Sequence, residues 1–182
     1  MKNLLIVIFS LWQFSLALGQ PNHVRFFSLQ DGLTNQQVLD VVHDEDGYLW
    51  VATELGLNRF AGKAFKSYYA SDNQDGRSIN SNEINTLLYD DQKIYIGTRS
   101  NGLNVLDLHT NKFSYYLHDP ADPKSIATND ITDIIKSKNG NLWIATYHQG
   151  LQHFDPIKKE FRRYNRKNFP KLPENSIWSL VE

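Results

Sequence analysis

Residues 139–146 read NGNLWIAT, and residues 46–53 carry the same pattern as DGYLWVAT. Asn-Gly and Asp-Gly pairs readily adopt the positive φ angles that a tight hairpin turn requires. The residues that follow are mostly β-branched, aromatic or aliphatic, which is typical of a strand. The two stretches therefore indicate a hairpin that occurs more than once in the chain.

The hairpin belongs to a longer repeat with a period of about 47 residues. Four asparagines mark this period at spacings of 47, 47 and 46 residues: Asn35, Asn82, Asn129 and Asn175. The middle copy of the hairpin reads DQKIYIGT at residues 91–98, so it has Tyr95 in place of Trp and no glycine in its turn. Similarity at one fixed period predicts tandem copies of a single structural unit.

Each copy has room for four short strands. The first strand is predicted at residues 38–42, 84–89 and 131–135, and its apolar composition indicates burial on both faces. The second is predicted at residues 48–53, 94–98 and 142–146; the third begins at a Gly-Leu pair, and the fourth carries a Phe-x-x-Tyr spacing. Such a unit in tandem predicts an all-β fold, a β-propeller built from four-stranded blades. The repeated aromatic residues are expected to pack between blades, and Trp143→Ala to cost about 3–5 kcal/mol.

The repeat also predicts the domain organisation. We expect a partial propeller over residues 20–182, with blades at about 28–72, 78–119 and 125–167 and the start of a fourth from residue 175. About three and a half blades fall short of the four to eight of a closed propeller. The expected propeller is therefore incomplete, as in a fragment of a longer protein or a truncated gene product, and its end blades would expose apolar faces.

The first residues predict export. Lys2 precedes an apolar run over residues 4–18, and Ala17 and Gly19 are small residues placed as a signal peptidase requires. Residues 1–19 are therefore predicted to be a signal peptide, and the rest of the chain to be periplasmic. The chain has no cysteine, which excludes thiol catalysis and disulfides, and its formal net charge of −1 gives no reason to expect nucleic-acid binding.

The blade pattern resembles the two-component regulator propeller repeat. The resemblance rests on residues 38–53 and 139–151, on the opening DGLTN at residues 31–35, and covers everything after about His23. Members of that family form the periplasmic part of hybrid sensor histidine kinases of the Bacteroidetes type. The resemblance thus implies a parent anchored in the inner membrane, with the kinase and other phosphorelay domains C-terminal to these residues.

The polar residues suggest no metal, cofactor or catalytic site. Asp44 and Asp46 faintly resemble a calcium loop, but the closing glutamate is missing, and a plain hairpin turn is favoured. His148 and His153 are spaced so that they fall on opposite faces of a strand, which disfavours a shared metal. A basic stretch at residues 158–171 is interpreted as a solvated outer strand, with an anionic glycan or membrane surface as the alternative.

The loop after the second strand varies while the rest of the repeat is constant. It reads Glu-Leu at residues 54–55, Arg-Ser-Asn at 99–101 and Tyr-His-Gln at 147–149, and we expect it to share a face with the polar linkers between blades. Varied loops on a constant frame are common binding sites, although loops also vary without function. The residues predicted to face a ligand are Arg99, Asn101, Tyr147 and His148.

The predicted function is ligand sensing, with an oligosaccharide as the ligand implied by the resemblance. The predicted partners are this ligand, the remaining blades and signalling domains of the same protein, and a second copy in a homodimer. Two alternatives stay open. An exported propeller enzyme, a polysaccharide lyase or hydrolase, would use His148 and nearby carboxylates for acid–base chemistry. A structural propeller would serve only dimer contacts.

Overall fold

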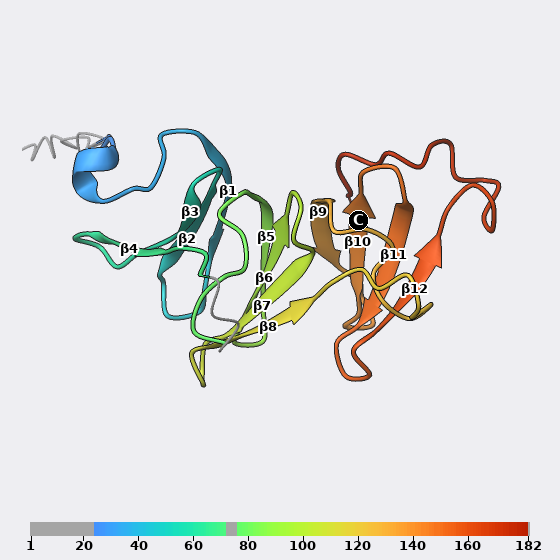
Figure 1. Ribbon diagram of the computed structural model, residues 1–182. Coiled ribbons are helices and arrows are strands. Elements are labelled where there is room, and N and C mark those ends of the chain that lie inside the picture. Colours follow the sequence, from blue (N-terminus) through green and yellow to red (C-terminus); the bar gives the residue numbers. More distant parts are fainter. Residues whose placement is uncertain (1–23, 72–75, 182) are drawn as a thin grey trace, which may run out of the picture.

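The computed structural model describes residues 24–71 and 76–181; the predicted signal peptide lies outside these residues. The described residues form three four-stranded antiparallel sheets, each a meander in chain order (Figure 1). This confirms the predicted propeller blades. Blade 1 contains β1 (Val38–His43), β2 (Leu49–Thr53), β3 (Gly56–Phe60) and β4 (Phe65–Tyr68). Blade 2 contains β5 (Ile84–Asp90), β6 (Lys93–Thr98), β7 (Leu103–Asp107) and β8 (Lys112–Tyr116). Blade 3 contains β9 (Ile131–Lys136), β10 (Leu142–Thr146), β11 (Gly150–Asp155) and β12 (Glu160–Tyr164).

A 3₁₀ turn, η1 (Leu29–Asp31), precedes blade 1, and the three blades stand side by side in Figure 1. Among the residues that the structure describes, no helix is long and apolar enough to cross a membrane.

The hairpin between β5 and β6 keeps a tight turn without glycine. Asp90 pairs with Lys93, which leaves Asp91 and Gln92 as a two-residue turn with φ angles of 46° and 59°. Positive φ at both positions is the geometry of the type I′ turn that suits the twist of a hairpin. The turn without glycine is therefore shorter than its counterparts, because residues 44–48 and 137–141 separate the paired strands in blades 1 and 3, where Gly47 and Gly140 have positive φ.

The glycine that opens the third strand is required by close packing. At Gly102 and Gly150 the φ angles are 68° and 78°. A Cβ atom there would lie 2.3 Å from the Tyr116 carbonyl oxygen and 2.2 Å from the Tyr164 carbonyl oxygen, respectively. No side chain fits at these distances, so the Gly-Leu pair marks where the third strand passes under the end of the fourth.

The first strand of each blade lies beside the first strand of its neighbour: β1 contacts β5, and β5 contacts β9. An aspartate of β1 bonds to β5, and its repeat counterpart in β9 bonds to the C-terminal segment. The Asp40 Oδ2 atom accepts a hydrogen bond from the Leu87 N–H at 2.7 Å, and the Asp133 Oδ2 atom accepts one from the Leu180 N–H at 2.7 Å. Residues 175–181 thus lie beside β9 as β5 lies beside β1, where a further first strand would be expected.

The core is divided between the two blade interfaces, with one cluster of buried residues between blades 1 and 2 and another between blades 2 and 3. Trp50 of β2 is fully buried in the first cluster, and Tyr95 of β6 is 3% exposed in the second. The predicted packing of aromatic landmarks between blades is therefore confirmed at these two positions.

Two predictions about burial were wrong, both at the ends of the blade array. β1 is not buried on both faces: Val38 and Val41 are 44% and 48% exposed, because no described blade covers that side of blade 1. Trp143 belongs to neither of the buried clusters between the described blades. It is half-buried and packs on rings of its own blade, with centroids 4.6 Å from His153 and 5.4 Å from Tyr164, because no described blade covers blade 3 on its far side.

Candidate ligand-binding site

A surface groove of about 470 Å³ runs across the inner strands of all three blades. Its lining comes from each blade and from the C-terminal segment: Leu39, Glu54, Asn85, Arg99, Asp130, Thr132, Tyr147 and Trp178. A ligand in this groove would therefore touch three blades at once.

Three of the lining residues are bulge residues of the inner strands. The pairing register shifts by one residue at the start of β1, β5 and β9, which leaves one residue unpaired in each strand. These residues are Leu39, Asn85 and Thr132. Because a β-bulge redirects its extra side chain away from the regular alternation, each blade turns one variable side chain towards the groove.

Three more lining residues share a second repeat position. Glu54, Arg99 and Tyr147 each follow the threonine that ends the second strand of a blade. Each of these buried threonines donates a hydrogen bond from Oγ1 to the carbonyl of the glycine that opens the next strand. The bond closes a loop of two residues in blade 1 and of three residues in blades 2 and 3, and an acid, a base and an aromatic residue follow the threonine in turn.

The loops are also tied to the linkers between blades. The Arg99 N–H donates to the Glu83 carbonyl at 3.1 Å, and the Tyr147 N–H donates to the Asp130 carbonyl at 3.1 Å. These bonds confirm the expectation that the varied loops share a face with the linkers. They also hold Arg99 and Tyr147 at the groove through their own backbone.

The charged groups of the groove are loosely paired. The Arg99 Nη1 atom lies 4.0 Å from the Glu54 Oε1 atom, and both side chains are open to solvent, so this ion pair contributes little to stability. Burial raises the pKa of Asp130, while the positive charges of Arg99 and His148 act in the opposite direction. The Arg99 guanidinium and the two carboxylates therefore remain available to a ligand.

One end of the groove is aromatic. The ring of Tyr147 lies 5.4 Å from that of Trp178 and 3.7 Å from that of His148. Tyr147 is 37% exposed and Trp178 is 69% exposed. Flat apolar surface thus faces solvent beside the polar groups.

The four residues predicted from sequence occupy different places. Arg99 and Tyr147 line the groove, and His148 packs on Tyr147 while its Nδ1 atom lies 2.9 Å from the Ser176 hydroxyl. Asn101 is not among the lining residues. Its amide donates to the Asn80 carbonyl at 3.1 Å, and the Asn80 amide donates back to the Asn101 carbonyl at 3.0 Å, so it joins the loop to the linker.

Sequence reasoning missed the bulge residues, Glu54, Asp130 and Trp178. Glu54 could have been found, because it precedes the Gly-Leu pair in the same register as Arg99 and Tyr147. The bulge residues could not have been found, because nothing in the sequence distinguishes them from other strand residues. Trp178 reaches the groove only because residues 175–181 lie beside β9, where the Ile177 N–H donates to the Thr146 carbonyl at 3.2 Å.

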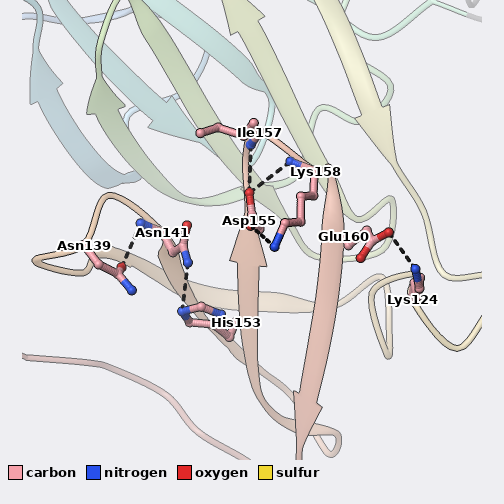
Figure 2. A network of polar contacts seen from close by, with 8 residues as sticks. All are labelled: Lys124, Asn139, Asn141, His153, Asp155, Ile157, Lys158 and Glu160. Carbon is pink, nitrogen blue, oxygen red and sulfur yellow. Dashed lines mark hydrogen bonds and ion pairs between the residues drawn. The ribbon is translucent and has the colours of Figure 1, made fainter.

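The remaining acidic and histidine candidates have structural partners. The Asp44 carboxylate accepts hydrogen bonds from the Trp50 indole N–H at 2.8 Å and from the Tyr48 N–H at 2.9 Å, as a hairpin turn requires. Figure 2 shows His153 pointing towards Asn141, with 3.4 Å between the His153 Nε2 and Asn141 Nδ2 atoms. Within residues 24–71 and 76–181, no group of three or more acidic or histidine side chains could hold a metal ion.

The polar network at the opposite end of blade 3 belongs to a turn (Figure 2). The Asp155 carboxylate accepts hydrogen bonds from the N–H groups of Ile157 and Lys158, and these bonds, led by the one from Lys158, lower its pKa. Lys124 forms an ion pair with Glu160 at 2.7 Å, which joins the linker to β12. These groups shape the β11–β12 turn.

Known proteins share both the repeat and the fold. Residues 32–54 and 125–148 match the two component regulator propeller family. Histidine kinase P4 of Formosa agariphila is 39% identical over 75 residues, which are 41% of this chain and 5% of that protein. The extracellular domain of a hybrid two component system from B. thetaiotaomicron is 37% identical with a TM-score of 0.81, over 85% of this chain and 22% of that structure.

A more distant likeness concerns the fold alone. Virginiamycin B lyase from Staphylococcus aureus superposes with a TM-score of 0.56 at 14% identity, over 80% of this chain and 45% of the lyase. The chain spans less than half the length of each of these three proteins. The matches nevertheless agree with the resemblance found in the sequence: the chain has a β-propeller fold, and two stretches of it match the two component regulator propeller repeat.

Proposed function

We propose that this chain is a ligand-sensing part of the extracellular region of a two-component sensor, and that its groove binds an oligosaccharide. The observation that carries the proposal is the groove itself, in which corresponding positions of three similar blades carry different side chains. The similarity to the extracellular domain of a hybrid two component system supports the sensor class. The sensor would be periplasmic, joined to further blades and C-terminal signalling domains, and able to form homodimers.

The chemistry of the lining suits a sugar. Tyr147 and Trp178 offer aromatic faces on which the C–H face of a pyranose ring stacks, as ligand pockets combine apolar walls with a few placed polar groups. Asn85 and Arg99 offer amide and guanidinium donors for sugar hydroxyls. Glu54 and Asp130 offer acceptors, and so does the Thr132 hydroxyl, whose own proton is donated to the Ile177 carbonyl. The volume of about 470 Å³ fits one or two sugar residues.

The position of the groove also suits signalling. A ligand that contacts three blades binds best to one arrangement of them, and it therefore shifts the population towards that arrangement. The segment at residues 175–181 supplies Trp178 and leads towards the C-terminus, so it would transmit this shift.

Calorimetric titration with a panel of oligosaccharides tests the proposal. We expect one class of oligosaccharide to bind. Tyr147→Ala and Arg99→Ala should each weaken this binding by about tenfold or more, because they remove a stacked ring and a charged hydrogen bond, respectively. The matched controls are Ile157→Ala and Lys138→Ala, in the β11–β12 and β9–β10 turns away from the groove. Unchanged binding by the groove variants would refute the assigned site.

The enzyme alternative predicts a different result. Glu54 and Asp130 would then act as acid and base, and the bound oligosaccharide would be cleaved. Chromatography of the titrated sugars after incubation distinguishes the two, because product formation that is lost in Asp130→Asn would overturn the sensor proposal.

A further inference from the structure

One cross-strand row of blade 2 carries smaller residues than the same row in its neighbours. Strand pairing defines this row in each blade: Trp50, Arg59 and Lys66 in blade 1, Tyr95, Val105 and Ser114 in blade 2, and Trp143, His153 and Arg162 in blade 3. Blades 1 and 3 thus place a tryptophan beside two basic side chains. Blade 2 has a tyrosine, an aliphatic residue and a small hydroxyl instead.

Arg59 shows what this row does between blades 1 and 2. Strand alternation places it on the same side of β3 as Leu57, which belongs to the buried cluster between these two blades. Its guanidinium carbon lies 4.6 Å from the centre of the Tyr48 ring and 5.6 Å from that of Trp50. A cationic side chain packed on aromatic rings therefore occupies this part of the interface.

Between blades 2 and 3 the corresponding place is a hollow of about 160 Å³. Its walls include the whole blade 2 row and residues from the facing side of blade 3: Tyr95, Val105, Ser114, Phe154, Pro156 and Lys159. It adjoins a larger hollow of about 640 Å³ that lies among the β5–β6, β9–β10 and β11–β12 turns, and Lys93 and Tyr95 line both. Neither hollow shares a lining residue with the groove, so the two form a separate place on the molecule.

The smaller hollow offers the groups that a guanidinium binds. Asp107 lines it, and the Thr110 N–H and hydroxyl both donate to its Oδ1 atom, at 2.7 Å and 2.9 Å, so that Oδ2 can accept from a ligand. The bond from the Thr110 N–H, above all, lowers the pKa of Asp107 and keeps this carboxylate charged. Tyr95 and Tyr116 add aromatic rings to the same walls. A planar guanidinium pairs with carboxylates and stacks on aromatic rings, which matches this set of groups.

Two lysines in the same walls indicate a negative charge elsewhere on the ligand. Lys159 lines the smaller hollow, and Lys93 lines both hollows, with its Nζ atom donating to the Asp91 carbonyl at 3.3 Å. An ammonium group repels a guanidinium and attracts a carboxylate. A ligand that carries both charges at opposite ends therefore suits these walls better than a simple cation does.

We propose that the hollow between blades 2 and 3 binds arginine, either as the free amino acid or as the C-terminal residue of a peptide. The guanidinium takes the place that the Arg59 side chain fills between blades 1 and 2, and it donates to the Asp107 carboxylate. The carboxylate of the ligand meets Lys93 and Lys159. This site is independent of the oligosaccharide groove, so it stands whether or not the groove binds a sugar.

Calorimetric titration of the full chain with four compounds tests the two charges. Arginine should bind, whereas citrulline, which has a neutral ureido group, and agmatine, which lacks the carboxylate, should each bind about tenfold more weakly or worse. The peptide Gly-Gly-Arg distinguishes the two sources: tighter binding than arginine favours a peptide C-terminus, and weaker binding favours the free amino acid. Equal affinity for arginine and citrulline or agmatine would overturn the proposal, as would no binding of either arginine or Gly-Gly-Arg.

Two variants test the location. Val105→Arg gives blade 2 the residue that blade 1 has, so it should fill the hollow and abolish arginine binding without lowering the Tm. Asp107→Asn keeps the shape of the side chain but removes its charge, and it should weaken arginine binding by about tenfold or more even if Val105→Arg fails to fold.

Asp155→Asn is the matched control. Asp155 ends β11 as Asp107 ends β7, and it also accepts hydrogen bonds from the turn that follows, but it lines neither hollow. Arginine binding should therefore survive Asp155→Asn, and it should also survive Tyr147→Ala in the groove. Unchanged binding in Asp107→Asn, or an equal loss in Asp107→Asn and Asp155→Asn, would overturn the proposal.

Discussion

Trp50 is predicted to be the residue on which the interface between blades 1 and 2 depends most. Its side chain is fully buried, and its indole N–H donates to the Asp44 carboxylate at 2.8 Å. A buried aromatic side chain removes about 150–250 Å² from water, which at about 25 cal/mol per Å² corresponds to about 4–6 kcal/mol. Trp50→Ala also leaves Asp44, which is 3% exposed, without one donor. We therefore expect a loss of about 4–5 kcal/mol, within the range for such truncations.

Trp143 provides the matched control, since it occupies the same repeat position in blade 3. It is half-buried, and within the described part of the chain its ring packs on His153 and Tyr164 of its own blade. Trp143→Ala should therefore cost about 1–2 kcal/mol, as partial burial implies, rather than the 3–5 kcal/mol expected from sequence. Trp50→Phe separates the two contributions, because it keeps most of the apolar area and loses the hydrogen bond, at a cost of about 1–3 kcal/mol.

Urea unfolding followed by far-UV circular dichroism measures all three variants, since the signal does not depend on tryptophan. Repeat arrays can unfold blade by blade, so the comparison uses the first transition in each curve. The reasoning is refuted if Trp143→Ala destabilises the protein as much as Trp50→Ala.

Three further predictions follow from particular contacts. Gly150→Ala should lower the Tm far more than Gly140→Ala. Both glycines have positive φ angles, but a Cβ at Gly150 would lie 2.2 Å from the Tyr164 oxygen, whereas nothing lies within 4 Å of a Cβ at Gly140. Similar melting temperatures of the two variants would contradict this reasoning. Burial raises the pKa of Tyr95 from 10.0 to about 12, so the folded state holds this proton longer than the unfolded state. The stability that Tyr95 contributes is present below pH 10 and is lost as the pH rises through about 12, and Tyr95→Phe should make the alkaline loss of stability shallower in denaturant titrations. Asp133→Ala should speed the hydrogen exchange of the Leu180 amide, whereas exchange of the Leu87 amide, which bonds to Asp40, should not change. If the Leu180 amide exchanges equally fast in the parent and in the variant, residues 175–181 do not depend on this bond.

Much of the fold could be predicted from residues that act locally. Asp46-Gly47 and Asn139-Gly140 favour hairpin turns independently of their surroundings. The positive φ angles of Gly47 and Gly140, 82° and 86°, agree with this prediction. The fixed spacing of the landmarks predicted the four-strand unit, and the three four-stranded sheets confirm it. Arg99 and Tyr147 were predicted as ligand-facing because the loop that carries them varies on a constant frame, and both line the groove.

Only the tertiary structure decided the features that depend on an adjacent blade or on strand pairing. Whether a landmark tryptophan is buried depends on the presence of a blade beside it, so Trp50 and Trp143 differ although their local sequences are alike. The groove depends on bulges in β1, β5 and β9, and a bulge follows from the pairing register, which no single strand specifies. The packing of Phe27 depends on rings 33 and 38 residues further along the chain, at Phe60 and Phe65, because the fold brings the segment before blade 1 onto the outer strands of that blade.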